Sequence, residues 1–167
     1  MQQNSPANLS LESTIAKRPL RSKLSSLYGE IRNGMWTQAN HYLVPYLIPA
    51  SLQSSFKYMK TPTKKIFINK DMYLPLNAAL NFVMANHLES KITSFDGCFN
   101  VRLTRGSSRM SVHSYALAID LNAAENPLGA APKMDPGIVK CFEDAGFVWG
   151  GRWHRPDGQH FQWVTED

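Results

Sequence analysis

Two short stretches of this 167-residue sequence combine histidine and carboxylate side chains in a way that suits metal chemistry. The first runs from Ser111 to Asp120, with His113 in a polar loop and Asp120 among apolar residues. A carboxylate buried in such a segment is costly unless it is paired, hydrogen-bonded or bound to a metal. One histidine and one aspartate also fit an ordinary pair in a protein core, so this stretch alone leaves both alternatives open.

The second stretch, Pro156 to Trp163, places His160 at the start of an apolar segment, with Asp157 shortly before it. Together the two stretches supply two imidazoles, one carboxylate ligand and a spare carboxylate. Catalytic zinc takes three protein ligands from His and Asp/Glu and leaves a fourth position open for water. A nearby carboxylate can accept a proton from that water. The two stretches therefore predict an open metal site of a hydrolase, although similar ligands also suit other divalent ions.

Strands are needed to bring these side chains together. Alternating or continuous apolar residues, bounded by turn-forming residues, predict five short strands. These are Ile66–Ile68, Cys98–Thr104, Ala116–Leu121, Phe147–Trp149 and His160–Val164. Strands outnumber helices and no regular βαβ alternation is present. The expected fold class is therefore α+β, with a mainly antiparallel sheet flanked by helices.

Two helices are predicted beside the sheet. The first spans Leu74 to Leu88, because apolar residues recur there at helical spacing and a proline suits the first turn. The apolar positions are Leu76, Ala79, Leu80 and Val83, with Phe82 beside them. The second spans Pro136 to Ala145, with Asp135 as N-cap and Gly146 after its end.

Both stretches resemble motifs of one family of zinc peptidases. Ser111 to Asp120 resembles the S-x-H-x-x-G-x-A-x-D motif of D-alanyl-D-alanine carboxypeptidases and L-alanyl-D-glutamate endopeptidases. These enzymes are related in fold to lysostaphin and to the N-terminal domain of hedgehog proteins. Asp157-x-x-His160 resembles the second motif of the family, D/E-x-x-H, and Phe147–Trp153 is similar to the segment before it in phage endolysins. The resemblance covers residues 66–164.

The resemblance implies a role for each matched residue. It implies that His113, Asp120 and His160 bind Zn²⁺. It also implies that Asp157 is the catalytic base, which takes a proton from water and returns it to the leaving amine.

Two further positions take a functional interpretation and an ordinary one. Arg102 matches the active-site arginine of the family, which could stabilise the oxyanion or hold a substrate carboxylate; the alternative is a solvent-facing strand residue. Ser111 either binds substrate or stabilises a turn. Ala116 stands where the family has glycine, and we expect activity to survive because this position supplies no ligand.

The remaining histidines and the cysteines match no motif. His154 is expected to lie in a cleft or at the surface. Cys98 and Cys141 are expected to be buried free thiols, since neither belongs to a Cys-x-x-Cys pair.

Charge is distributed unevenly along the chain, which carries a formal net charge of +5. Residues 1–70 contain ten Lys/Arg and two acidic residues, whereas residues 71–167 contain eight Lys/Arg and eleven acidic residues. A basic N-terminal part suggests an anionic partner, such as wall polymers, or a docking site on other virion proteins. A merely solvated surface explains the charge equally well. No nucleic-acid motif is present, and no apolar run approaches the roughly 18 residues of a membrane span.

We predict a basic N-terminal arm and helical segment over residues 1–60, docked on a zinc peptidase domain over residues 61–167. The predicted function is hydrolysis of a peptide bond in bacterial peptidoglycan, as a phage endolysin or a virion-associated lysin. The alternative is a non-catalytic virion structural or adaptor protein that reuses the fold. The N-terminus is not typical of a secretory signal, so we expect synthesis in the cytoplasm, the host's for a phage protein, and action on the wall after release or from a virion.

Overall fold

The computed structural model describes residues 17–58 and 61–167, so residues 1–16 of the predicted N-terminal arm lie outside the described residues. The α-helices are α2 (Leu24–Tyr28), α3 (Ala39–Tyr42), α4 (Tyr73–Ala85) and α5 (Pro136–Asp144). The strands are β1 (Ile31–Arg32), β2 (Met35–Trp36), β3 (Leu43–Leu47), β4 (Lys57–Tyr58), β5 (Thr61–Pro62), β6 (Lys65–Asn69), β7 (Phe95–Gly97), β8 (Ala118–Leu121), β9 (Val148–Trp149) and β10 (His160–Gln162). Short 3₁₀ helices connect them, among them η1 (Arg21–Lys23), η5 (Val112–Tyr115) and η6 (Gly150–Arg152).

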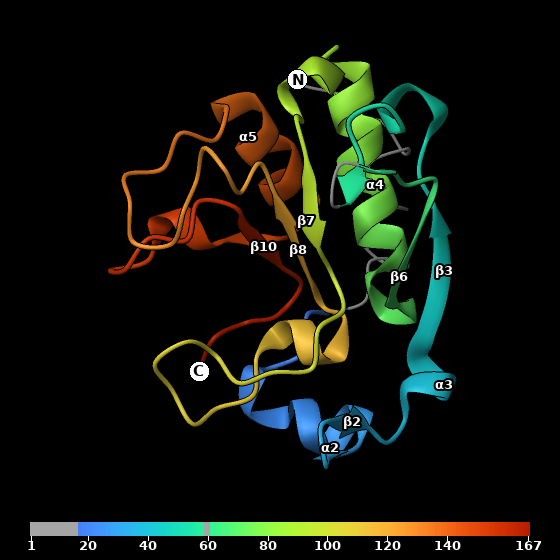
Figure 1. The fold of residues 1–167 in the computed structure, drawn as a ribbon, viewed down its shortest axis with the longest axis vertical. Helices are drawn as coiled ribbons and strands as arrows, with labels where there is room; N and C mark the ends of the chain where they lie inside the picture. The colour runs from blue at the N-terminus through green and yellow to red at the C-terminus, as the bar shows by residue number, and fades with distance from the viewer. Residues whose placement is uncertain (1–16, 59–60) are drawn as a thin grey trace, which may run out of the picture.

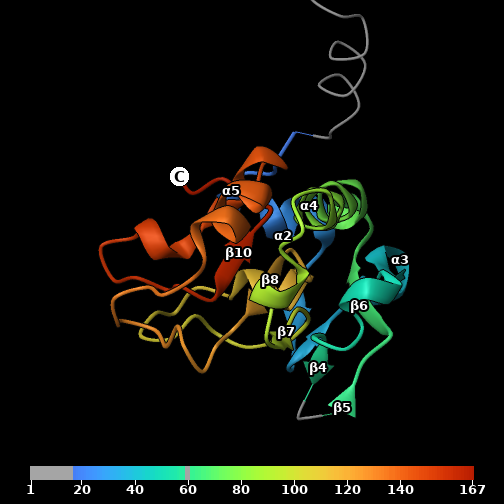
Figure 2. The ribbon, with the colours of Figure 1, turned by 90° about the horizontal axis from the view of Figure 1, so that it is seen from above.

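A four-stranded antiparallel sheet lies at the centre of the domain (Figure 1). Its strand order is β7-β8-β10-β9, and the remaining strands form two-stranded antiparallel pairs. The helices α4 and α5 lie side by side over this sheet (Figure 2). This arrangement confirms the predicted α+β class with an antiparallel sheet.

The helix α4 buries the apolar stripe that the sequence predicts. Leu76, Ala79, Leu80 and Val83 are fully buried, whereas Phe82, beside this stripe, is 41% exposed. The helix also ends at Ala85 rather than at Leu88. His87 adopts a left-handed backbone conformation with φ 56°, which terminates a helix.

The helix α5 begins and ends as predicted. The Asp135 side chain caps it by accepting a hydrogen bond of 2.8 Å from the Gly137 amide. Beyond its end, Gly146 has φ +90°, and a Cβ there would lie 2.7 Å from the Trp163 ring. Glycine is therefore required at this position on both conformational and steric grounds.

The predicted strand over Cys98–Thr104 is wrong. The strand β7 ends at Gly97, and between Cys98 and Thr104 only Leu103 forms an isolated bridge, with Met110. The backbone of this segment bonds to the η5 turn instead of to a neighbouring strand. Asn100 N donates to His113 O at 3.1 Å, and Ser114 Oγ accepts from Arg102 N at 3.0 Å. The partner of this segment is therefore a turn and not a strand.

The described N-terminal residues pack into the same hydrophobic core as the sheet. Buried side chains from α2, β2 and β3 belong to one cluster with those of α4, β8 and β10. The division near residue 60 stays a prediction. Over the residues that the structure describes, none of the helices has the length and apolar character needed to traverse a bilayer.

Candidate active site

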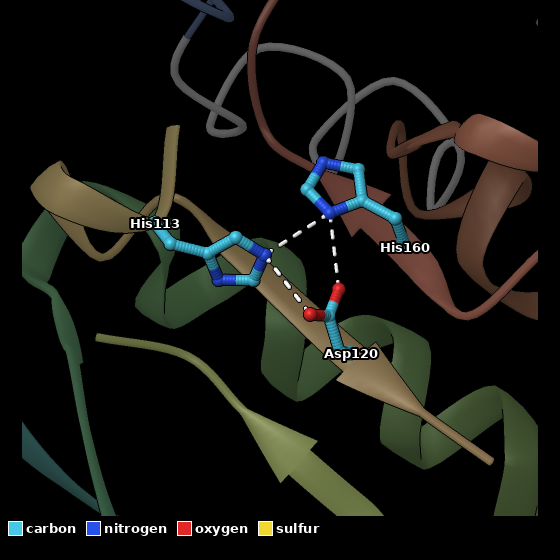
Figure 3. A group of neighbouring side chains, drawn as sticks. All are labelled: His113, Asp120 and His160. Carbon is cyan, nitrogen blue, oxygen red and sulfur yellow. Dashed lines mark hydrogen bonds and ion pairs between the residues drawn. The ribbon is translucent and has the colours of Figure 1, made fainter. Parts of the chain in front are cut away.

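The register of β8 and β10 brings Asp120 and His160 together. These two residues are directly opposite each other in the antiparallel pair, which places their Cβ atoms about 5 Å apart. Asp120 Oδ1 lies 3.0 Å from His160 Nδ1. Because Ile119 and Leu121 on the same strand are fully buried, Asp120 points to the opposite face, away from α4 (Figure 3).

His113 reaches the same point from the η5 turn. Ser111 caps this turn, with its Oγ 3.3 Å from the His113 amide nitrogen. The turn ends at Ala116, whose φ of 51° lies in the left-handed region. His113 Nε2 then lies 3.2 Å from Asp120 Oδ2 and 3.1 Å from His160 Nδ1 (Figure 3).

The left-handed conformation of Ala116 explains why the family motif has glycine at this position. Glycine adopts positive φ at little cost, whereas alanine does so rarely. The turn is held from outside by Asn69 at the end of β6. The backbone nitrogen of Asn69 donates to Ala116 O at 3.0 Å, and its side-chain Nδ2 donates to Tyr115 O at 3.1 Å.

The outer nitrogens of both imidazoles are engaged in hydrogen bonds. His113 Nδ1 lies 2.9 Å from the Cys98 carbonyl oxygen, and His160 Nε2 lies 3.1 Å from Gln162 Oε1. The carbonyl oxygen of Cys98 and the side-chain amide oxygen of Gln162 can only accept, so both of these nitrogens must carry protons. In the neutral rings, His113 Nε2 and His160 Nδ1 therefore present lone pairs to each other and to Asp120.

These converging lone pairs need a positive charge between them. The ligand atoms of His113, Asp120 and His160 all lie within 4.8 Å of one another, and two imidazole nitrogens with a carboxylate form a donor set that zinc binds. The three residues therefore fit a divalent cation.

The electrostatics of the cluster without metal lead to the same requirement. Burial alone would raise the pKa of Asp120, but His113 and His160 hold it well below its usual range. Burial would lower the pKa of His160, but the hydrogen bond and charge of Asp120 outweigh it and raise that pKa. Both shifts show that the three side chains favour a positive charge between them.

Asp157 lines the same cleft as Asp120 and His160. Its backbone is fixed by a 3.0 Å hydrogen bond from its amide to Gly150 O, and a Cβ on Gly150 would approach Asp157 O to 2.8 Å. Its Oδ1 is buried without a hydrogen-bond partner among the described residues. Burial, together with the charge of Asp120, raises the pKa of this carboxyl above its usual value despite His160.

Arg102 and Ser111 also line this cleft. Arg102 is half-buried and lies in a loop, so its predicted place in a strand is wrong, although its side chain borders the site. Ser111 is buried and caps the η5 turn, which is the structural role considered for it. The roles of these residues toward substrate stay predictions.

Some cleft residues were not singled out from the sequence. Arg21 and Arg155 line the cleft, and Gln162 lies behind His160. The spacing of Gln162 and His160 on one strand, two residues apart, was a usable signal, since such residues share a face. Arg21 lies far from the motifs in sequence and carried no signal. His154, in contrast, is exposed and is not part of the His–Asp cluster found among the described residues.

The fold and site together define a class of protein: an α+β domain with a His–Asp–His cluster that could hold a cation, beside a partly buried carboxylate in a cleft, which is a layout that suits a hydrolase. Residues 105–163 match the model of a peptidase family described as D-alanyl-D-alanine carboxypeptidase. This segment contains the whole cluster and Asp157, and the match confirms the family that the motifs resemble. It supports a peptidase that acts on cell-wall peptides. No curated protein and no solved structure matches the chain.

Proposed function

We propose that this chain is a zinc-dependent murein peptidase, which hydrolyses a peptide bond in the stem peptides or crosslinks of bacterial cell walls. The observation that carries the proposal is the convergence of lone pairs from His113, Asp120 and His160 beside Asp157 in one cleft. The family match over residues 105–163 supports the same chemistry.

The chain's own residues divide the work of hydrolysis. His113, Asp120 and His160 would hold Zn²⁺, which when bound activates water and polarises the scissile carbonyl. Asp157 holds a carboxylate with a free buried oxygen at the cleft, where it can take a proton from the attacking water and return it to the leaving amine. The raised pKa of Asp157 suits this exchange, because the group becomes a stronger base.

Arginines line the cleft and favour an acidic substrate. Arg102, Arg105 and Arg155 border it, and no ion pair with a carboxylate is found for these three among the described residues. Guanidinium groups match carboxylates and oxyanions in geometry. Stem peptides carry several carboxylates, so their charge complements this cleft. We assign Arg102 to the oxyanion or to a substrate carboxylate, because it borders the cleft at the position that resembles the active-site arginine of the family.

We further propose that the protein acts on the wall as a phage endolysin or from a virion. The experiment that tests the catalytic proposal is release of new amino groups from purified murein, with zinc content measured on the same sample. The wild type should release amino groups and hold one equivalent of zinc, and EDTA should abolish the release. Asp157→Asn should hold zinc but release almost nothing, whereas Asp144→Asn, on the exposed face of α5, should act as wild type.

A wild-type protein that holds zinc and binds murein or virion components but cleaves no peptide would refute the proposal. That outcome would favour the non-catalytic structural or adaptor role.

A further inference from the structure

Behind His160, the fully buried side chain of Gln162 has only one workable orientation. Its amide nitrogen donates to Val164 O at 3.3 Å and to Glu166 Oε1 at 2.9 Å, while its oxygen faces His160 Nε2. Turning the amide over would place its oxygen against these two acceptors, with no donor for it at either. The orientation of Gln162 therefore requires a proton on His160 Nε2, and it leaves Nδ1 free to face Asp120.

Glu166 is held in turn by a residue from the N-terminal part of the chain. Arg21 Nη1 donates to Glu166 Oε1 at 2.7 Å. The Arg21 side chain is only 13% exposed, and its Nη2 donates to Thr104 Oγ1 at 2.8 Å. The Arg21 backbone is fixed as well, because its amide donates to Thr165 O at 2.9 Å.

These contacts form a continuous series of hydrogen bonds from Arg21 through Glu166 and Gln162 to His160. The charges of Arg21 and Glu166 offset each other, so the series orients Gln162 without adding net charge near the cation site. Arg21 and Glu166 both lie outside the residues that match the family model.

We propose that Arg21, Glu166 and Gln162 are positioning residues for the metal centre: they fix the tautomer and ring orientation in which His160 binds a divalent cation. The inference rests on the metal site of the proposed function but not on its substrate. Outer partners of metal-binding histidines typically contribute about 10–100-fold to metal affinity. The N-terminal segment is then a working part of the site.

The test is the zinc dissociation constant of the full chain, measured by competition with a chromophoric chelator. Gln162→Met keeps the length of the side chain but removes both hydrogen-bonding groups, and it should weaken zinc binding about 10–100-fold. Glu166 and Arg21 are one and two hydrogen bonds further from His160, so Glu166→Gln and Arg21→Gln should weaken zinc binding less. The matched control is Glu143→Gln, which removes the same charge from a surface ion pair with Arg152 and should leave the affinity unchanged.

Two further measurements separate positioning from a general loss of stability. The free energy of unfolding in EDTA shows how much each substitution costs the metal-free fold. In the zinc-loaded protein, the His160 Nε2 proton should exchange slowly by NMR, and it should exchange faster in Gln162→Met. Should Gln162→Met fail to fold, Glu166→Gln and Arg21→Gln carry the test at the less buried end.

Unchanged zinc affinity in these variants, with a His160 Nε2 proton that exchanges as in wild type, would overturn the inference. Failure of the proposed function would look different. A wild-type chain that binds zinc but cleaves no murein would refute the peptidase, and the affinity series would still decide the role of the three residues.

Discussion

Replacing Asp157 with asparagine should lower the rate of catalysis and raise the stability of the metal-free fold. The substitution keeps the shape of the side chain but removes the base that accepts a proton in the cleft. General base catalysis typically contributes 10²–10⁴-fold, or about 3–5 kcal/mol of transition-state stabilisation. We expect kcat to fall by about that factor while bound zinc stays at one equivalent, since Asp157 is not part of the cluster.

The same substitution should stabilise the metal-free fold. Asp157 Oδ1 is buried without a partner, and burial raises the pKa of this carboxyl. A raised folded-state pKa means that the folded protein binds more protons than the unfolded chain, so this group lowers stability as pH rises through the interval between the two values. Below the unfolded pKa, about 3.9, the penalty is absent. The asparagine variant should therefore gain on the order of 1 kcal/mol near neutral pH and lose that gain in acid.

The assay is chemical denaturation in EDTA at several pH values, paired with zinc analysis and murein hydrolysis of the loaded protein. Asp144→Asn serves as control, because Asp144 is exposed and pairs with Lys140 on the surface. An asparagine variant that hydrolyses murein at the wild-type rate would refute the assignment of Asp157 as base. An asparagine variant that is less stable than wild type at neutral pH would refute the claim that the buried oxygen of Asp157 lowers the stability of the fold.

Three further outcomes follow from the site. Ala116→Gly relieves the left-handed strain of alanine, worth about 1–2 kcal/mol, but loses a buried methyl group worth about 0.8 kcal/mol. Denaturation should therefore show a change in the free energy of unfolding of about 1 kcal/mol or less, whereas Ala116→Val should lower that free energy by more than about 2 kcal/mol. Zinc at 100 times its dissociation constant should stabilise the fold by about 2.7 kcal/mol, and a melting temperature that ignores zinc would contradict the cation site. Arg102→Gln should lower kcat/KM about 100-fold with zinc content unchanged, measured on murein; an unaltered rate would leave Arg102 as a solvent-facing residue.

The side chains of the candidate site could be predicted because each follows a strong local rule. Asp120 interrupts an apolar strand, and His160 begins another, so both had to face away from the core once the strands paired. The register that sets them opposite each other follows from burying Ile119 and Phe161 on the same face, because a shift of one strand by one residue would turn its buried residue to the other face. Their role as zinc ligands stays a prediction.

Residues that depend on contacts distant in sequence could not be predicted in the same way. The sequence pattern over Cys98–Thr104 does not say whether the partner of the segment is a strand or the η5 turn. Positive φ at Ala116 was indicated only by the glycine of the family motif. Nothing in the sequence near Arg21 connects it to a tail residue 145 positions away.

The matched segment of 105–163 contains the candidate cation-binding side chains but only some of the groups that orient them. The Cys98 carbonyl fixes the tautomer of His113 from the end of β7, and Asn69 holds the η5 turn from the end of β6. Arg21 and Glu166 lie near the two ends of the described chain, and they connect to His160 through Gln162. A ligand set can therefore be recognised from a short motif, but its tautomers and angles require the packed domain. For this reason we expect a fragment limited to the matched residues to bind zinc far more weakly than the full chain.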